Sequence, residues 1–483
     1  MHHLMNYIDG AFVHANDGQT LEDYNPATGK VVASIPRSQR ADVTLAADAA
    51  KKAQPAWNAL SLKERAAWLD KIADALQEKH EAIAQAETMD TGKPISLSRR
   101  VDASRSVDNF RFFAEFGRSQ KPMLFEMDDA INHVHRNGLG VVGLITPWNL
   151  PLYLLSWKVA PALLMGNAIV AKPSELTPLT ANILAETLDE LQLPKGVFNM
   201  VHGLGPEVGQ AILEDERITG ISFTGGTATG RIVAATAAPL FKKLSLELGG
   251  KNATIILEDA DMGQAVKGAV RAAFTNSGQV CLCGSRILVH ASIASTFLAA
   301  FVAEVESMTI GNPIEPSSQI GTLISMDHLE KVESYIDLAI EEGGTILTGG
   351  TRAMTGAIGP SPDGAYLSPT VVSGLSHLSR CATEEIFGPV VTVHTFETLE
   401  QATVMANATE YGLAGSIWTA DLEKGQALAA TIETGIVWIN TWLHRDLRTP
   451  FGGVRNSGVG REGGQWSLEF FSETTNVCVM NQK

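Results

Sequence analysis

The chain has 483 residues, of which 45% are hydrophobic and 19% are charged, so it can bury a large core and wholesale disorder is excluded. Its 37 basic side chains are outnumbered by 53 acidic ones, and the net charge of −16 argues against a nucleic-acid partner. Four cysteines are too few for a disulfide framework and lack the spacing of a zinc site. We therefore expect a cytoplasmic protein without a bound metal.

The first hundred or so residues are predicted to form one short strand followed by helices. The strand pattern covers residues 6–13. Ser61 and Glu64 have the spacing of a capping box, and apolar side chains recur at helical spacing after them. Gly92 and Pro94 are expected to end this helical region.

The chain between Arg136 and Lys158 carries no charge over a length that could cross a membrane. Glycines interrupt its first part, and Pro147 and Pro151 interrupt its middle, which favours a strand, a turn and a helix over one spanning helix. The first ten residues also lack the apolar run of a secretory signal. We expect a buried segment here and no membrane partner.

Short apolar runs that are rich in β-branched residues alternate with helical stretches from residue 141 onward. This alternation is typical of parallel βαβ units and predicts an α/β fold with a doubly wound sheet. The runs cover residues 141–145, 168–171, 197–201, 218–223 and 244–248, with helices at 152–165 and 181–191. Beyond them, a second α/β region is indicated by helices at 264–274 and 329–342 and by strands at 286–290 and 390–395.

Ligands of doubly wound sheets bind beyond the carboxyl ends of the strands, and two groups at those positions indicate a dinucleotide. Gly225 and Gly230 open a helix directly after a strand, where backbone N–H groups and the helix dipole can bind a pyrophosphate. Lys172 and Glu175 follow another strand, and a carboxylate there repels a 2′-phosphate, which favours NAD over NADP. The alternatives are a plain strand-to-helix turn and an exposed ion pair, because the glycine spacing differs from the G-x-G-x-x-G fingerprint.

Cys281 is the candidate nucleophile, because the small polar residues before it predict a loop rather than core. A thiol reacts as the thiolate, so either its surroundings lower its pKa or a nearby base takes the proton. Glu247 ends an apolar strand and is the candidate base, since burial there would raise the pKa of its carboxyl. The alternatives are an inert buried thiol, which we expect for the other three cysteines, and a carboxylate that caps a helix or pairs with Lys251.

Six motifs together resemble the NAD(P)-dependent aldehyde dehydrogenase family over nearly the whole chain. They are Pro147-Trp148-Asn149, Lys172-Pro173-Ser174-Glu175, Phe223-Thr224-Gly225, Leu246-Glu247-Leu248-Gly249-Gly250-Lys251, Gly278-Gln279-Val280-Cys281 and Glu384-Glu385-Ile386-Phe387-Gly388-Pro389. The resemblance implies a doubly wound NAD-binding domain, an α/β catalytic domain and a small β oligomerisation arm. Their expected ranges are 1–116 with 138–248, 249–450, and 117–137 with 465–483.

The same resemblance implies roles for individual residues. Cys281 matches the nucleophile, Glu247 the general base and Asn149 an oxyanion donor. Cofactor contacts fall on Trp148, Lys172, Glu175, Gly225, Gly226, Gly230, Glu385 and Phe387. Gly226 departs from the family pattern, which commonly has serine there, so backbone donors must suffice for the phosphate.

These roles imply NAD-dependent oxidation of an aldehyde to a carboxylic acid through a thiohemiacetal and a thioester on Cys281. Glu247 would activate the water that hydrolyses the thioester, which argues against the branch of the family that transfers the acyl group to coenzyme A. Rival interpretations are a cysteine hydrolase that needs no nicotinamide and a non-catalytic scaffold protein. The family also implies a homodimer or homotetramer, and the strand expected at residues 468–480 offers an edge for pairing between subunits.

The loop before this last strand indicates an acidic aldehyde as the substrate. It carries Arg445 and Arg448, and arginine binds a carboxylate bidentately. Together with residues 109–113 and 148–152, the loop resembles 2-hydroxymuconic and 2-aminomuconic semialdehyde dehydrogenases. This resemblance implies that Arg111 and Arg448 bind the substrate carboxylate, although the sequence leaves open whether Arg445 or Arg448 faces it. The alternative is a broad-specificity or betaine-type aldehyde dehydrogenase.

Overall fold

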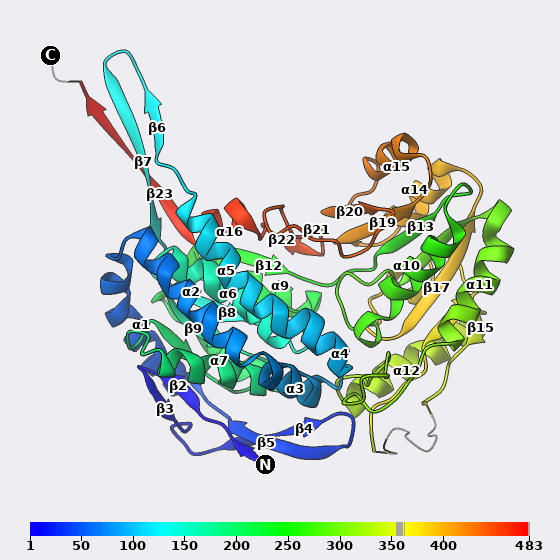
Figure 1. Cartoon of the computed structure of the whole chain (residues 1–483), viewed down its shortest axis with the longest axis horizontal. Coiled ribbons are helices and arrows are strands. Elements are labelled where there is room, and N and C mark those ends of the chain that lie inside the picture. Colours follow the sequence, from blue (N-terminus) through cyan, green and yellow to red (C-terminus); the bar gives the residue numbers. More distant parts are fainter. Residues whose placement is uncertain (354–360, 362, 482–483) are drawn as a thin grey trace.

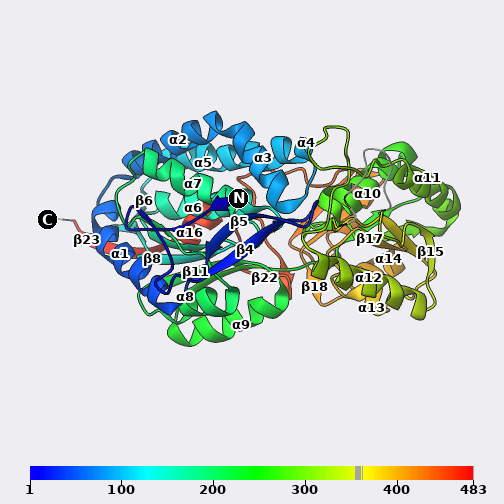
Figure 2. The same cartoon turned by 90° about the horizontal axis from the view of Figure 1, so that it is seen from below.

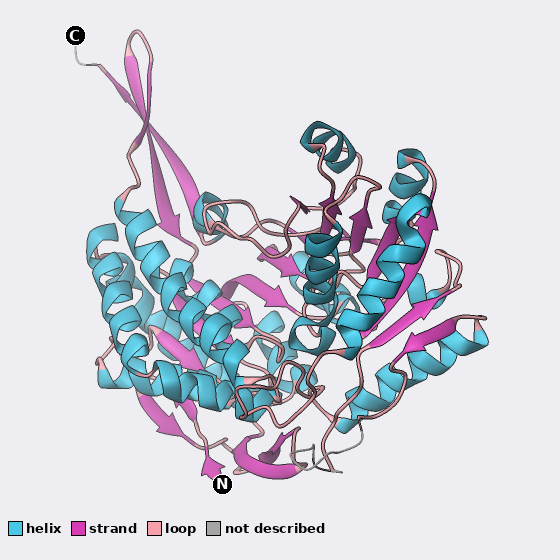
Figure 3. Ribbon diagram, turned by 45° about the vertical axis from the view of Figure 1, so that its right-hand side comes forward, coloured by secondary structure: helices cyan, strands magenta, loops and turns pink. Residues whose placement is uncertain are grey.

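The computed structural model describes residues 1–353, 361 and 363–481, and it has two α/β lobes with a β arm projecting from the first lobe (Figure 1). Seen from below, the lobe built mainly from the first half of the chain lies beside the lobe built from the second half (Figure 2). In both lobes, helices pack outside the strands (Figure 3).

The first lobe contains the predicted doubly wound sheet. Its eight strands have the order β22-β12-β11-β8-β9-β10-β2-β3, where β22 is Gly458–Val459. The five strands from β12 to β10 in this order pair in parallel. These are β8 (Val141–Ile145), β9 (Ala168–Lys172), β10 (Phe198–Met200), β11 (Ile218–Thr224) and β12 (Lys243–Glu247). From β8 the chain runs outward through β9 and β10, and then returns to build β11 and β12 on the other side. The switch point beside β8 is where such sheets bind ligands.

The uncharged stretch before Lys158 forms strand β8 and the first half of helix α6 (Pro151–Leu164). Nearly all of α6 is buried, so its apolar character comes from packing inside the lobe. In the described part of the chain, each helix is too short or too polar to cross a membrane. The expectation of a buried strand, turn and helix is confirmed.

The N-terminal predictions hold with one refinement. The strand expected at residues 6–13 is a hairpin of β2 (Asn6–Ile8) and β3 (Ala11–Val13), which turns at two residues with positive φ, Asp9 and Gly10. Ser61 and Glu64 form the predicted capping box of helix α2 (Leu62–Glu78). Helix α3 (His80–Thr91) ends at Gly92, whose left-handed φ of 68° is costly for other residues. The other helices before residue 240 are α1 (Arg40–Asn58), α4 (Ile95–Leu97), α5 (Ser104–Arg118), α7 (Leu179–Glu190), α8 (Gln210–Glu214) and α9 (Thr227–Ala237). A small separate sheet consists of strands β1 (His2–His3), β4 (Thr20–Asn25) and β5 (Lys30–Pro36).

The second lobe has its own seven-stranded sheet, of order β15-β16-β17-β14-β13-β19-β20. The predicted strands are β14 (Arg286–His290) and β17 (Val390–Phe396), and the predicted helices are α10 (Met262–Phe274) and α12 (Met326–Glu341). The other strands are β13 (Ala253–Ile256), β15 (Thr345–Thr348), β16 (Thr370–Ser373), β19 (Ala414–Trp418) and β20 (Ile436–Ile439), and the other main helices are α11 (Ala294–Glu306), α14 (Leu399–Asn407) and α15 (Leu422–Ala429).

The arm is a three-stranded antiparallel sheet of β6 (Met123–Glu126), β7 (Ala130–Gly138) and β23 (Ser472–Met480). Strand β23 pairs with β7 along its whole length and leaves its other edge free of partners in the described structure. The strand expected from residue 468 begins four residues later, because residues 468–470 complete helix α16 (Gly464–Phe470). Cys478 lies exposed on β23, so the expectation that it is buried was wrong.

Candidate active site

The carboxyl ends of the central strands bring the predicted site residues to one edge of the first sheet. Trp148 and Asn149 follow β8, Gly225 and Gly226 follow β11, and Glu247 ends β12. These strands are neighbours in the order β12-β11-β8, so the side chains at their ends face the same crevice. Trp148 and Glu247 meet there although they are 99 positions apart in the chain.

A cavity of about 340 Å³ opens at this edge, and both lobes line it. Its wall contains eight of the predicted residues: Trp148, Asn149, Gly225, Gly226, Glu247, Cys281, Glu385 and Phe387. The nucleophile, base and oxyanion donor implied by the sequence therefore meet in one place. The other three predicted cofactor residues lie outside the wall that the described residues form. Lys172 and Glu175 are at the carboxyl end of β9, and Gly230 is in α9.

A tight left-handed turn carries Cys281 into the cavity. Asn276, Ser277 and Gly278 all have positive φ, between 52° and 73°. A Cβ at Gly278 would stand 2.1 Å from the carbonyl oxygen of Gly388, so glycine is required at this close approach. The predicted loop is confirmed, and its unusual backbone explains why small polar residues precede the cysteine.

The surroundings of Cys281 do not stabilise a resting thiolate. Burial, followed by the nearby carboxylate of Glu247, raises the pKa of the Cys281 thiol above its ordinary value. Of the two routes to a thiolate considered above, this direction does not favour a lowered pKa. The remaining route is a base that takes the proton when the substrate binds.

Glu247 has the environment of such a base. Burial, with a further contribution from Glu462, raises the pKa of the Glu247 carboxyl well above its ordinary value. Both of its carboxyl oxygens are buried, and neither has a hydrogen-bond partner among residues 1–353, 361 and 363–481. The same holds for the ammonium of Lys251, so the alternative in which Glu247 pairs with Lys251 or caps a helix through its side chain is not what the structure contains.

Two charged residues at this site were missed by the sequence reasoning. Lys158 on α6 donates to Glu462 at 2.6 Å and to the hydroxyl of Ser222 at 2.8 Å, and its side chain is fully buried. Lys158 is the first charge after the uncharged stretch, and a lysine in a buried helix needs a partner. That signal could have identified Lys158, but nothing local to Glu462 indicates that it is the partner.

Aromatic and acidic side chains form the wall contributed by the second lobe. Trp148 lies 5.3 Å from the ring of Phe387 and 5.4 Å from the ring of His328, a residue that the sequence reasoning did not single out. His328 shares a 2.7 Å hydrogen bond with the carbonyl of Phe387, and burial lowers the pKa of its imidazole to about 4. His328 is therefore neutral near pH 7. Glu385 accepts a hydrogen bond of 2.8 Å from the backbone N–H of Gly250.

The two arginines expected to bind a substrate carboxylate are not in the cavity wall. Arg111 is half exposed on α5 and pairs with Asp74 at 3.3 Å. The side chain of Arg448 is 72% exposed, and it pairs with Asp446 two residues earlier. The helical and loop positions turn these side chains outward, so the assignment of the carboxylate site to Arg111 and Arg448 is corrected. The loop instead points Arg445 into the wall.

Comparison with known proteins identifies the family. A family model described as "Aldehyde dehydrogenase family" matches residues 12–477. The chain belongs to the aldehyde dehydrogenase family. This aldehyde dehydrogenase is therefore an oxidoreductase that acts on an aldehyde group, and the interpretation as a cysteine hydrolase is excluded.

The enzyme is similar to several known proteins over 99% of its length. The 2-hydroxymuconic semialdehyde dehydrogenase of Pseudomonas sp. (strain CF600) is 43% identical, with 99% of this chain and 100% of that protein covered. The 2-aminomuconic semialdehyde dehydrogenase of Homo sapiens is also 43% identical, with 99% and 98% covered. Among solved structures, PnpE from Pseudomonas sp. WBC-3 superposes with a TM-score of 0.96 at 42% identity, with 99% and 98% covered. PnpE has also been crystallised with nicotinamide adenine dinucleotide.

Proposed function

We propose that this aldehyde dehydrogenase uses NAD to oxidise an aldehyde that carries a carboxylate, of the 2-hydroxymuconic or 2-aminomuconic 6-semialdehyde type. The observation that carries the proposal is a partly buried cation in the wall of the cavity that also contains Cys281. The names of the full-length relatives point to the same substrate class.

That cation is Arg445, which is held in place by its neighbours. Its guanidinium carbon lies 4.0 Å from the ring centroid of Phe451 and 5.1 Å from that of Trp157. Nη1 donates to the hydroxyl of Tyr153 at 3.0 Å. Nη2 is buried without a hydrogen-bond partner in the described chain. A buried cationic donor left in this state is stabilised by an anionic acceptor, and a substrate carboxylate supplies one.

The catalytic residues act in a fixed order in this proposal. Glu247 takes the thiol proton of Cys281, and the sulfur adds to the aldehyde carbon to form a thiohemiacetal. An N–H of Asn149 stabilises the oxyanion, as does the backbone N–H of Cys281. Glu247 releases the thiol proton to solvent, and loss of hydride from the aldehyde carbon leaves a thioester. Glu247 then takes a proton from water, the hydroxide adds to the carbonyl carbon, and the C–S bond breaks to release the carboxylic acid while the proton on Glu247 returns to the sulfur.

The wall of the cavity fits a dinucleotide. A Cβ built at Gly226 meets no heavy atom of the described residues within 4 Å, so open space lies at the N-terminus of α9, where a pyrophosphate can approach the backbone. Trp148, Gly225, Glu385 and Phe387 would hold the remaining parts. When bound, NAD supplies the acceptor for the hydride that leaves the aldehyde carbon.

Two predicted cofactor residues support NAD over NADP. Lys172 pairs with Glu175 at 2.8 Å at the carboxyl end of β9, and Glu175 keeps 29% of its side chain exposed. A carboxylate at this position can accept from a ribose hydroxyl and repels a 2′-phosphate. Gly230 contributes by packing, because a Cβ there would stand 2.5 Å from the side chain of Leu248.

The domain ranges, the cytoplasmic location and the homodimer or homotetramer stay predictions. Assembly is supported by the arm, where apolar side chains of the described residues remain exposed: Met123, Leu124, Phe125, Met127, Val477, Val479 and Met480. A monomer rarely leaves so many apolar side chains on one projecting sheet, and a second copy would cover them.

The test is a steady-state assay with NAD and with NADP against 2-hydroxymuconic semialdehyde and an uncharged aldehyde of similar length. We expect higher kcat/KM with NAD and with the acid, and loss of turnover in Cys281→Ser. A preference for the uncharged aldehyde would overturn the substrate proposal. Intact turnover in Cys281→Ser would overturn the mechanism.

A further inference from the structure

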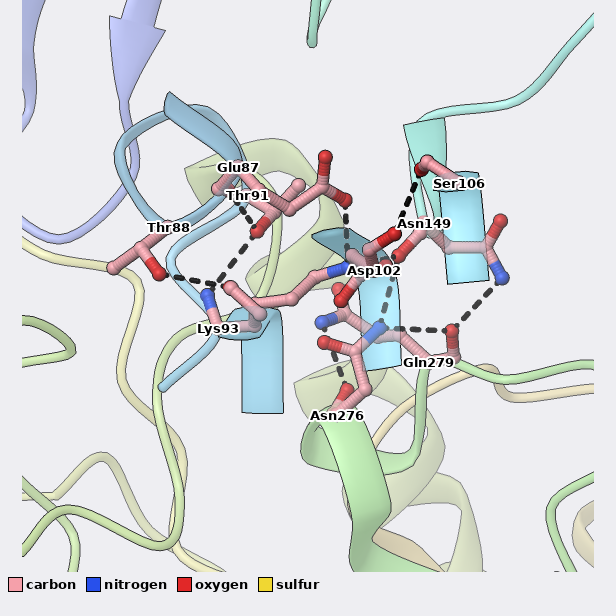
Figure 4. Close-up of polar contacts among 10 residues, drawn as sticks. Glu87, Thr88, Thr91, Lys93, Asp102, Ser106, Asn149, Asn276 and Gln279 are labelled. Atoms are coloured by element: carbon pink, nitrogen blue, oxygen red, sulfur yellow. Dashed lines mark hydrogen bonds and ion pairs between the residues drawn. The ribbon is translucent and has the colours of Figure 1, made fainter. Parts of the chain in front are cut away.

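A fully buried ionic cluster lies behind the oxyanion donor (Figure 4). Lys93, in the turn between α3 and α4, donates to Glu87 of α3 at 2.9 Å. It also donates to Asp102 at 3.0 Å, which lies in a π-helical turn at residues 98–103. The third donor of the ammonium reaches the backbone carbonyl of Asn149 at 2.9 Å. All three N–H groups of the Lys93 ammonium therefore donate hydrogen bonds, and one of these bonds goes to the backbone of Asn149.

The cluster keeps Lys93 charged despite its burial. Desolvation alone would lower the pKa of the ammonium, but the nearby charges of Asp102 and Glu87 outweigh it and raise the pKa above its ordinary value. Burial raises the pKa of the Asp102 carboxyl well above its ordinary value, although the ammonium of Lys93 opposes this shift. Lys93 is thus a permanent cationic donor toward Asn149.

The carbonyl of Asn149 is the point where three segments of the chain meet. It accepts from Lys93 and, at 3.1 Å, from the side chain of Asn276 in the turn before the nucleophile. The side-chain amide of Asn149 donates one N–H to the carbonyl of Gln279 at 3.0 Å. Figure 4 shows these contacts converging on Asn149.

The remaining N–H of this amide is the one that can stabilise an oxyanion, because Asn149 lines the cavity. The amide oxygen Oδ1 is buried and has no partner in the part of the chain that the structure describes. The orientation of the amide therefore depends on one side-chain hydrogen bond and on where the backbone of Asn149 is held. Lys93 contributes directly to the second of these.

We propose that Lys93 is a positioning residue for the oxyanion site, and that its ammonium, anchored by Glu87 and Asp102, holds the Asn149 carbonyl and so aims the Asn149 amide. The inference rests on the proposed role of Asn149 as oxyanion donor. A misplacement of about 1 Å in such a site can lower the rate about 10²-fold. Removing an oxyanion donor altogether costs about 10²- to 10³-fold in kcat.

The experiment is a double-mutant cycle with Lys93→Met and Asn149→Ala in the full-length enzyme. Lys93→Met keeps the apolar stem and removes the ammonium, and we expect kcat to fall at least about tenfold with KM for NAD nearly unchanged. In the Asn149→Ala background the same substitution should cost less than about threefold, because the group that it positions is already absent.

Two further variants separate positioning from stability. Thr88→Val breaks the buried 2.8 Å hydrogen bond between Thr88 and Ser98, which joins the same two segments without touching Asn149. It should lower the melting temperature and leave kcat within about twofold, since most substitutions of this kind cost stability alone. Lys93→Arg keeps the charge for Glu87 and Asp102 but displaces the donor from the Asn149 carbonyl. It provides a folded test if Lys93→Met does not fold, with kcat again reduced.

The outcomes distinguish the two levels of the argument. Wild-type turnover in Asn149→Ala would refute the oxyanion role and with it the proposed function of that residue. A second outcome is a large loss of kcat in Asn149→Ala together with a loss from Lys93→Met that is equally large in the wild-type and the Asn149→Ala enzyme. That outcome would refute only the positioning role of Lys93. Wild-type kcat in folded Lys93→Met or Lys93→Arg would also refute it.

Discussion

Replacing Arg445 with methionine tests how the substrate is selected. The substitution keeps an unbranched apolar stem against Phe451 and Trp157 and removes the charge together with the free Nη2. A hydrogen bond to a charged group contributes about 1.5–3 kcal/mol, which corresponds to about a 10- to 150-fold loss in kcat/KM for the acidic aldehyde. The bond to Tyr153 is lost with either substrate. The ratio of kcat/KM for acidic and uncharged aldehydes therefore isolates the carboxylate contact.

The assay measures this ratio for the wild type, Arg445→Met and Arg448→Met. Arg448 is a matched control, because it lies in the same loop but is solvent-exposed and paired with Asp446, whose pKa it lowers to about 2. We expect a ratio that falls only in Arg445→Met. An unchanged ratio in that variant, or an equal fall in Arg448→Met, would refute the assignment of the carboxylate to Arg445.

Three other results are expected. In Glu247→Gln, both the deprotonation of Cys281 and the hydrolysis of the thioester should slow. Rapid mixing should therefore show slow formation of reduced nicotinamide from the first turnover, and a wild-type time course would contradict the general-base role. Because burial raises the pKa of the Glu247 carboxyl, the folded state loses stability as the pH rises above the ordinary pKa of a glutamate. Glu247→Gln should therefore have a higher melting temperature than the wild type at pH 7, and a lower one would contradict this sign. The exposed apolar side chains of the arm predict that the protein sediments as a dimer or tetramer and that Phe125→Glu weakens this association. A monomeric wild type would refute the proposal that the arm joins subunits.

Much of the fold and of the catalytic site could be predicted because the signals are local. Each of the five parallel strands was found within two residues of its observed bounds, since a strand buried on both faces must be continuously apolar. Strand ends in a doubly wound sheet converge on one edge, so Asn149, Gly225 and Glu247 could be assigned to a common crevice before their distances were known.

The failures concern side-chain direction and partners distant in the chain. Arg445 and Arg448 are three residues apart in one loop, and the sequence contains nothing that says which of them turns inward. Phe451 and Trp157 decide it, because their rings form the slot that accepts one guanidinium. Lys158 and Glu462 are likewise joined only by the packing of the last segment against the first sheet.

The sequence by itself determined the α/β layers, the positions of the parallel strands and the polar residues at their carboxyl ends, and it predicted the nucleophile and its base. These depend on periodicity, turn-forming glycines and short motifs, which act over a few residues. Only the tertiary structure decided the burial that raises the pKa of Glu247, the inward direction of Arg445 and the contact of Lys93 with the Asn149 carbonyl. Each of these depends on burial and on charges brought together from remote segments, and the low dielectric that makes such contacts strong exists only after the chain has folded.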